Sequence, residues 1–309
     1  LLANTKKTRS DKRYVSLDVA YGIRARVHLT MHNYADALKD AEAALASTSS
    51  VPYSSAAVSK PTFIDIEDAS WMWGILITDK DRVSTTGICN FPSHMGSLNY
   101  GYASVGGWRR ISPKLYNQIP ESDVRKGWFL DDTGVSVNLP AAAQAYITKK
   151  GAPVYTQVKY GPMNDEWGSN NNATDVILMR VEEMYLIKAE AQAMNNDVSG
   201  GVNTLNSFVN TYRDPSYKCT ATTGEAVQEA VWHQRRIEFW GEGLAYFDIM
   251  RLNKGVNRLG CGFPKTAVFN IAAGDPVQIY SIPNKEVQYN PLLENNPLVS
   301  APTPIPDEE

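Results

Sequence analysis

The chain has 309 residues, which is enough for one large domain or two ordinary ones with a sizeable core. Its formal net charge of −3 provides no basic field for binding nucleic acid or an anionic membrane surface. Because no run of about 18 apolar residues occurs, the sequence predicts no membrane-spanning helix.

Residues 18–47 have the pattern of two short helices joined by a tight turn. Ala20, Ile23 and Val27 share one helical face, and His32-Asn33-Tyr34 separates them from a second, alanine-rich run. Small side chains allow two helices to approach closely, and a joint of this kind is typical of a tetratricopeptide repeat. A generic helix pair is the alternative.

Residues 48–175 form a long insertion with mainly loop composition. Ser/Pro-rich, Gly/Ser/Tyr-rich and Asn-rich stretches at 47–61, 96–107 and 164–172 indicate turns and loops. Two short runs, 72–78 and 154–159, have strand-like composition, and burial is favoured for Trp71 and Trp73. Because long loops in compact proteins usually carry function, we expect ligand-binding residues in this insertion.

Residues 176–254 predict a second set of helices. Apolar residues recur at three- and four-residue spacing from Ile177 to Ala189, which places them on one helical face. Further helical runs cover 205–212, 226–240 and 244–252, and Pro215 ends the first of these. The expected fold class is mainly α, with tetratricopeptide-like helical hairpins and a long loop-rich insertion that contains short strands. The tail, 298–309, is rich in proline and is expected to be extended and mobile.

The densest cluster of charged residues lies near the end of the helical region. Glu238 and Glu242 are four residues apart and would share one helical face, as the two carboxylates of a glycosidase could. Arginines at three- and four-residue offsets would pair with them first. We therefore favour a partly buried structural ion-pair lattice, with the members Arg180, Glu183, Glu190, Arg235, Glu238, Glu242, Asp248 and Arg251.

Motifs for catalysis or for metal binding do not occur in the sequence. The histidines form no HExxH motif, and we find no GxSxG, P-loop or GxGxxG. Cys89, Cys219 and Cys261 are far apart and have no CxxC spacing, so no zinc or redox site is expected. We expect no catalytic residue, no metal and no cofactor.

Aromatic side chains in the insertion are the better candidates for function. Sugar rings present apolar C–H faces that stack on Trp and Tyr, while amide and guanidinium groups bond to the hydroxyls. Ordinary packing of the two tryptophans is the alternative. The predicted ligand-binding residues are Tyr100, Tyr102, Trp108, Arg109, Trp167 and Asn170.

Four groups of residues, in chain order, resemble motifs of the SusD/RagB family. The first runs from Ser112-Pro113-x-Leu115-Tyr116 to Asp123-x-Arg125 and on to Lys159-Tyr160. The second is Asp175-x-x-Leu178-Met179-Arg180-x-x-Glu183-x-Tyr185-Leu186-x-x-Ala189-Glu190-Ala191. The third is Arg235-x-x-Glu238-x-x-x-Glu242-Gly243-x-x-x-x-Asp248-x-x-Arg251, followed by Gly255. The fourth is Ile282-Pro283-x-x-Glu286-x-x-x-Asn290-Pro291 with Asn295.

Three positions depart from the family pattern. Gln234 stands where the family usually has Glu, Ala245 where it often has Arg, and Glu294 where Gln is common. These changes would thin the ion-pair lattice and leave the predicted ligand-binding residues untouched.

The resemblance implies a protein that binds oligosaccharide without catalysis and closes as a lid over a SusC-like TonB-dependent transporter. It also implies a surface-exposed lipoprotein of the bacterial outer membrane. One SusD-like domain would then cover 1–309 and lack its N-terminal part, signal peptide and lipidated Cys, so the numbering is expected to start inside a longer protein. Residues 14–47 and 176–254 would form the repeat scaffold, 48–175 the ligand-binding loops, and 256–309 a C-terminal loop and tail.

Three other functions remain open from the sequence. The first is peptide capture, as in the RagB branch, with Asn, Ser and Arg side chains meeting the peptide backbone. The second is a glycoside hydrolase that uses Glu238 and Glu242. The third is a repeat scaffold that binds neither glycan nor peptide.

Overall fold

The structure is a computed structural model and describes residues 10–81, 84, 90–297 and 299–302. It divides into two compact units. The main unit comprises Leu1–Ile111 and Leu115–Gly243, and the C-terminal unit comprises Ser112–Lys114 and Leu244–Glu309. Within the described ranges, no helix has both the length and the apolar character needed to cross a membrane.

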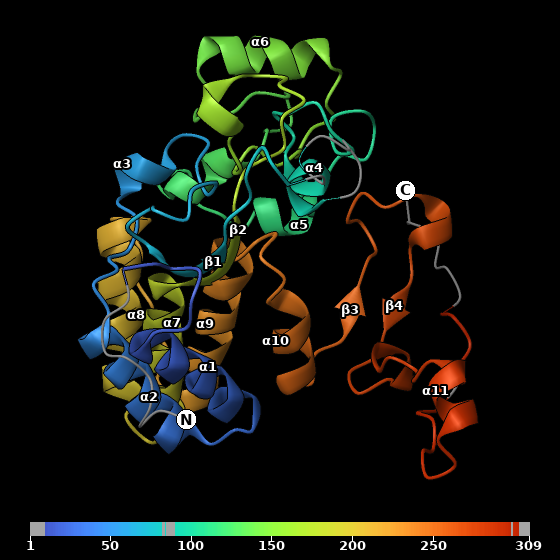
Figure 1. Ribbon diagram of the computed structural model, residues 1–309. Coiled ribbons are helices and arrows are strands. Elements are labelled where there is room, and N and C mark those ends of the chain that lie inside the picture. Colours follow the sequence, from blue (N-terminus) through green and yellow to red (C-terminus); the bar gives the residue numbers. More distant parts are fainter. Residues whose placement is uncertain (1–9, 82–83, 85–89, 298, 303–309) are drawn as a thin grey trace. The chain divides into compact units, whose positions relative to one another are not determined.

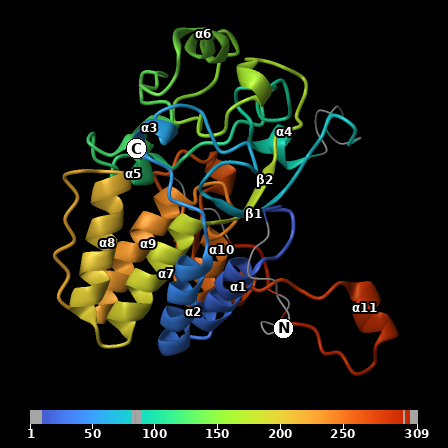
Figure 2. The same cartoon turned by 60° about the vertical axis from the view of Figure 1, so that its left-hand side comes forward.

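Five helices form the scaffold of the main unit, and they lie side by side in Figure 2. Helix α7 contacts the other four, so it is the centre of this layer. The mainly helical fold with tetratricopeptide-like hairpins is thereby confirmed. The five helices are α1 (Leu17–Thr30), α2 (Tyr34–Ser47), α7 (Val181–Met194), α8 (Val198–Tyr212) and α9 (Gly224–Glu238).

Small side chains at the helix contacts explain why both predicted hairpins form. Ala37, Ala41 and Ala44 of α2 are fully buried, which lets α2 approach its neighbours closely. In the second hairpin, a Cβ added to Gly201 would lie 2.7 Å from the carbonyl oxygen of Ala189. This position of α8 therefore has no room for a side chain against α7.

The start of the second helical region differs from the prediction. Ile177 was expected on a helix, but Val176–Arg180 form strand β2, and α7 begins at Val181. Strand β2 pairs antiparallel with β1 (Trp71–Ile75), where Trp71 lies opposite Arg180. The prediction was wrong at Ile177 because pairing with a strand about 100 residues earlier overrides a short helical pattern.

The insertion is loop-rich, as predicted, and contains only short elements (Figure 1). The strand-like run 154–159 forms isolated bridges instead of a strand, because Thr156 and Gln157 pair with different partners, Arg110 and Phe129. Trp71 is fully buried and its Nε1 donates a hydrogen bond to Tyr53 Oη at 2.7 Å. The short helices are α3 (Ser55–Val58), α4 (Phe91–Met95), α5 (Pro113–Tyr116), η3 (Val124–Trp128), α6 (Ala141–Lys149) and η4 (Met163–Asp165).

The C-terminal unit is built from short elements that follow one another along the chain. Helix α10 covers Ala245–Arg251, and strand β3 (Val256–Asn257) pairs antiparallel with β4 (Asn270–Ile271). Its remaining elements are η5 (Lys265–Ala267), η6 (Pro276–Gln278) and α11 (Asn284–Tyr289). Cys219 and Cys261 are free thiols, whereas Cys89 and most of the predicted mobile tail lie outside the described residues.

Candidate functional site

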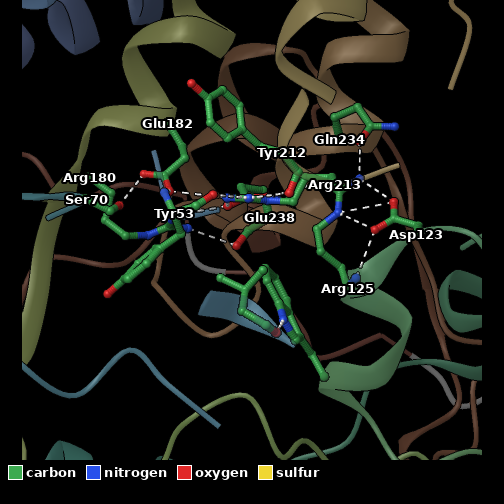
Figure 3. Close-up of polar contacts among 12 residues, drawn as sticks. Tyr53, Ser70, Asp123, Arg125, Arg180, Glu182, Tyr212, Arg213, Gln234 and Glu238 are labelled. Atoms are coloured by element: carbon green, nitrogen blue, oxygen red, sulfur yellow. Dashed lines mark hydrogen bonds and ion pairs between the residues drawn. The ribbon is translucent and has the colours of Figure 1, made fainter. Parts of the chain in front are cut away.

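Several charged side chains of the main unit form a buried network around Glu238 (Figure 3). Arg213 donates to both oxygens of this carboxylate, from Nε at 2.7 Å and from Nη2 at 2.8 Å. Arg180 Nη1 donates to it at 3.0 Å, and Arg125 Nη1 at 3.3 Å. Glu238 is therefore enclosed by three guanidinium groups from the end of β2, the segment after α8, and η3.

The second predicted acid, Glu242, has its own pair of cations. Arg180 donates to it from Nε at 3.0 Å and from Nη2 at 2.8 Å, and Lys159 Nζ lies 2.6 Å from Oε1. Burial lowers the pKa of Lys159 to about 8, although the Glu242 carboxylate acts in the opposite direction. Arg180 thus joins Glu238 and Glu242 into one lattice that ties β2 to the end of α9.

The protonation states of these two acids match a structural role. Burial raises the pKa of Glu238, but the guanidiniums of Arg213, Arg180 and Arg125 outweigh it and hold that pKa well below its usual range. Burial also raises the pKa of Glu242, and Arg180 with Lys159 reverses this effect. A glycosidase needs one carboxylic acid with a raised pKa, so the arrangement offers no support for a hydrolase at this pair.

The other predicted lattice members pair with one another or with further residues. Glu183 accepts hydrogen bonds from Arg26 Nε at 2.9 and 3.0 Å, and Arg235 Nη2 lies 3.8 Å from it. Glu190 accepts a hydrogen bond from Gln228 Nε2 at 2.9 Å. In the C-terminal unit, Asp248 and Arg251 form their own pair, with Nε 2.8 Å from Oδ1.

Sequence reasoning missed three of the central cations, namely Arg125, Lys159 and Arg213. A spacing of three or four residues identifies ion-pair partners on the same helix. These three side chains instead come from segments that are distant in sequence from Glu238 and Glu242. Arg125 and Lys159 do stand in the first motif of the family resemblance, which was the one available signal. No comparable signal marks Arg213.

The predicted ligand-binding residues lie in a different part of the main unit, on loops beside α6. Tyr100 and Tyr102 are 49% and 41% exposed. The Nζ of Lys150 lies 5.1 Å from the ring centroid of Tyr100, and the guanidinium of Arg109 lies 5.6 Å from that of Tyr102. We call Tyr100, Tyr102, Arg109, Lys150, Tyr146 and His94 the aromatic surface.

Backbone and side-chain contacts hold the loops of the aromatic surface in place. Tyr100 N donates to Ser169 O at 2.8 Å, and Tyr146 Oη donates to Asn99 O at 3.0 Å. The ring of His94 stacks on that of Tyr102, with centroids 4.4 Å apart. Arg109 Nη2 lies 3.2 Å from His94 Nδ1. Hydrogen bonds thus hold the loops that carry the two exposed phenol rings, and each ring has one cationic group beside it.

The two predicted tryptophans stand behind this surface. Trp108 and Trp167 are partly buried and pack against a small core cluster beneath α6 that includes Leu98 and Ile147. Asn170 is exposed, in the loop that follows Trp167. The structure therefore brings all six predicted residues into one region, with the tyrosines outermost and the tryptophans as partly buried supports.

This region has the groups that carbohydrate recognition requires. Exposed aromatic faces can stack on the C–H faces of a sugar, and Arg, Lys and Asn can bond to its hydroxyls. In the described part of the chain, no group of three or more His, Cys, Asp and Glu residues is arranged to hold a metal ion.

Comparison with known proteins places the chain among SusD-like proteins. The family model described as the SusD family matches residues 125–298, which is more than half of the chain. A comparison with curated proteins finds no match.

Solved structures share the fold at low sequence identity. A SusD superfamily protein from Bacteroides thetaiotaomicron VPI-5482 has a TM-score of 0.75 and 22% identity over 96% of this chain and 63% of its own. A putative sugar binding protein from Bacteroides vulgatus ATCC 8482 has a TM-score of 0.73 and 21% identity over 96% of this chain and 62% of its own. A SusD-like carbohydrate binding protein from the same strain has a TM-score of 0.64 and 23% identity over 90% of this chain and 51% of its own.

These values also set the extent of the match. Identities this low establish the fold and nothing finer. The chain spans 51–63% of the length of these three structures, so they contain regions with no counterpart here. The family match and the shared fold lead to one conclusion: the chain belongs to the SusD family.

Proposed function

We propose that the chain binds oligosaccharide at the aromatic surface, without hydrolysing it. The observation that carries this proposal is the pair of half-exposed tyrosines, Tyr100 and Tyr102, on loops fastened by hydrogen bonds, each with a cation beside its ring. The charged cluster that could have served hydrolysis is buried and fully paired at Glu238. Family membership supports the same function, since one structural neighbour is described as a carbohydrate binding protein.

We further propose that the bound glycan is delivered to a SusC-like TonB-dependent transporter of the outer membrane, from a lipoprotein at the cell surface. This part of the proposal rests on membership of the SusD family. Co-purification of the full-length protein with an outer-membrane transporter from the native host, before and after addition of the glycan, tests it. Recovery of the protein without any such partner would contradict it.

Titration calorimetry against a panel of neutral oligosaccharides and mixed peptides tests the binding function. Tyr100→Ala and Tyr102→Ala should each weaken glycan binding by about 1–3 kcal/mol, by analogy with the stacking of bases on aromatic side chains. Tyr14→Ala is the matched control, because Tyr14 belongs to the main unit but not to the aromatic surface, is 53% exposed and also has a cation beside its ring, with the Arg13 guanidinium 5.7 Å from the ring centroid.

Each outcome of that experiment decides between functions. Binding of peptides but not glycans would favour the RagB-like alternative. Release of new reducing ends from the glycans would favour a hydrolase. Unchanged glycan binding in both tyrosine variants would show that the aromatic surface is the wrong site.

A further inference from the structure

A second cleft, with a volume of about 460 Å³, lies in the main unit and shares no residue with the aromatic surface. Element η3, the loop that follows it, and Tyr116 and Tyr155 line this cleft. Its volume falls within the range of small-ligand sites, which is about 300–1,000 Å³. The cleft is therefore large enough for one or two sugar rings.

The lining of this cleft has an excess of negative charge. Asp123 is neutralised by Arg125, whose Nη2 lies 2.6 Å from Oδ2. Asp131 accepts hydrogen bonds from Thr133 and Val135, and Asp132 is exposed. Within the described residues, no cation pairs with Asp131 or Asp132, so neither carboxylate has a partner of opposite charge.

Tyr116 is a buried polar side chain that lines the cleft without using its hydroxyl. The residue is 8% exposed, and its Oη, which keeps contact with solvent, has no hydrogen-bond partner among the residues that the structure describes. Burial, followed by the charges of Asp131, Glu121 and Asp132, raises its pKa to about 12. The phenol therefore stays protonated and can donate a hydrogen bond to a ligand.

The second tyrosine is held in position by its backbone. Tyr155 has a φ of 64°, which is uncommon for a residue with a bulky side chain. Its N–H donates to Leu130 O at 3.0 Å, and its carbonyl accepts from Ile111 N at 3.0 Å. These bonds maintain the strained conformation and set the ring beside Tyr116, with centroids 5.2 Å apart.

One ammonium group of the protein itself lies against the lining of this cleft. The ammonium of Lys126 lies 5.1 Å from the ring centroid of Tyr116 and forms an ion pair with Glu121. A tyrosine face and a carboxylate together are a favourable environment for an ammonium group. Asp131 and Asp132 provide the carboxylates for a second ammonium in the same cleft.

We propose that this cleft binds an amine-bearing sugar, such as a glucosamine unit of a deacetylated glycan. The sugar ammonium would pair with Asp132 and Asp131, and Tyr116 Oη would donate to a sugar oxygen. A neutral sugar could offer these carboxylates only hydroxyl hydrogen bonds and no opposite charge, whereas an acidic sugar would be repelled. The inference rests on the proposed glycan-binding function and names a substrate class for a second site.

Two oligomers that differ only in charge test the proposal. We would titrate the protein with an oligomer of β-linked glucosamine and with the same oligomer in N-acetylated form. The glucosamine oligomer should bind at least about tenfold more tightly, and this advantage should shrink as ionic strength rises.

Two variants locate the charge preference in the cleft. Asp132→Asn should weaken binding of the glucosamine oligomer about fivefold and leave the acetylated oligomer unaffected, as expected for one partly exposed ion pair. Tyr116→Phe should weaken it by removing the donor while retaining the ring. Glu67→Gln, at an exposed carboxylate outside the cleft, is the control and should change neither affinity.

The outcomes separate this proposal from the proposed function. Neutral glycan binding without any charge preference would overturn the cleft proposal alone, and so would a preference that is undiminished in Asp132→Asn. Equal binding of a lysine-rich peptide, lost in Asp132→Asn, would overturn the assignment to a sugar. Persistence of the charge preference in Tyr100→Ala would show that the two sites are independent.

Discussion

The buried ion-pair lattice and the aromatic surface contain the same pairing of groups, a cation beside an aromatic ring, in opposite environments. In the lattice, Lys159 Nζ lies 4.5 Å from the ring centroid of Phe63, and both side chains are fully buried. On the aromatic surface, Lys150 lies 5.1 Å from the ring centroid of Tyr100, and both are exposed.

The two regions differ in whether a carboxylate pairs with the cation. Every central cation of the lattice has a carboxylate within hydrogen-bonding distance, as Lys159 has Glu242 at 2.6 Å. No ion pair is found for Arg109 or Lys150 among the described residues. Cations and rings whose bonding capacity is satisfied inside the protein stabilise it, whereas those left exposed and unpaired with carboxylates are available to a ligand.

The largest expected effect is that of Glu238→Ala. The variant would leave Arg213, Arg180 and Arg125 with unbalanced charge in a fully buried position, which should lower the free energy of unfolding by about 3–5 kcal/mol. Denaturant unfolding measures this loss, and glycan binding below the unfolding transition should be retained. A variant with unchanged stability and lost binding would show that the lattice, and not the aromatic surface, contains the site.

Acid should weaken the lattice before it affects the aromatic surface. Because the pKa values of Glu238 and Glu242 are lowered on folding, their contribution to stability is present above the unfolded value of 4.5 and is lost as pH falls through the folded values. The melting temperature should therefore fall as pH drops below 4.5. In Glu242→Gln this dependence should be shallower, and equal slopes in the two proteins would contradict the assignment.

Trp167→Ala should show whether Trp167 supports the loop by packing or contacts the ligand directly. Trp167 packs on the cluster beneath α6, so its removal should cost about 1–3 kcal/mol of stability and also weaken glycan binding by displacing the loop. Tyr100→Ala, at an exposed ring, should weaken binding with almost no change in stability. Thermal unfolding and calorimetry on the same samples separate the two effects. A Trp167→Ala protein that loses binding at parental stability would identify the indole as a direct contact.

The sequence was sufficient for features that depend on near neighbours. The hairpins α1–α2 and α7–α8 follow from apolar spacing and small residues within about 30 positions. The Gly/Ser/Asn setting of Tyr100 and Tyr102 likewise indicated exposed rings. The strand at Ile177 and the position of Arg213 could not be predicted, because each is decided by a partner distant in the chain.

The same limit applies to the cleft beside Tyr116. Tyr116 stood in a recognised motif, but nothing local to it indicates that Asp131, Asp132 and Tyr155 would gather around it. Only folding brings these segments together. A cation, an acid or an aromatic ring can therefore be identified in the sequence. Its role depends on whether the fold pairs it with another group of the protein or leaves it exposed to a ligand.

Lys150→Met gives the smallest effect and the most direct test of the comparison. It removes an exposed cation from beside Tyr100 and Tyr146 and keeps a flexible apolar side chain of similar length. If the ammonium donates a hydrogen bond to the ligand, affinity for a neutral glycan should fall by about 0.5–1.5 kcal/mol, the usual net contribution of one hydrogen bond. Loss of the exposed cation–aromatic contact should lower stability by no more than about 1 kcal/mol. Lys149→Met, on the neighbouring exposed residue, is the control. If both variants bind as the parent does, the rings alone recognise the ligand, and the unpaired cation is not part of the site.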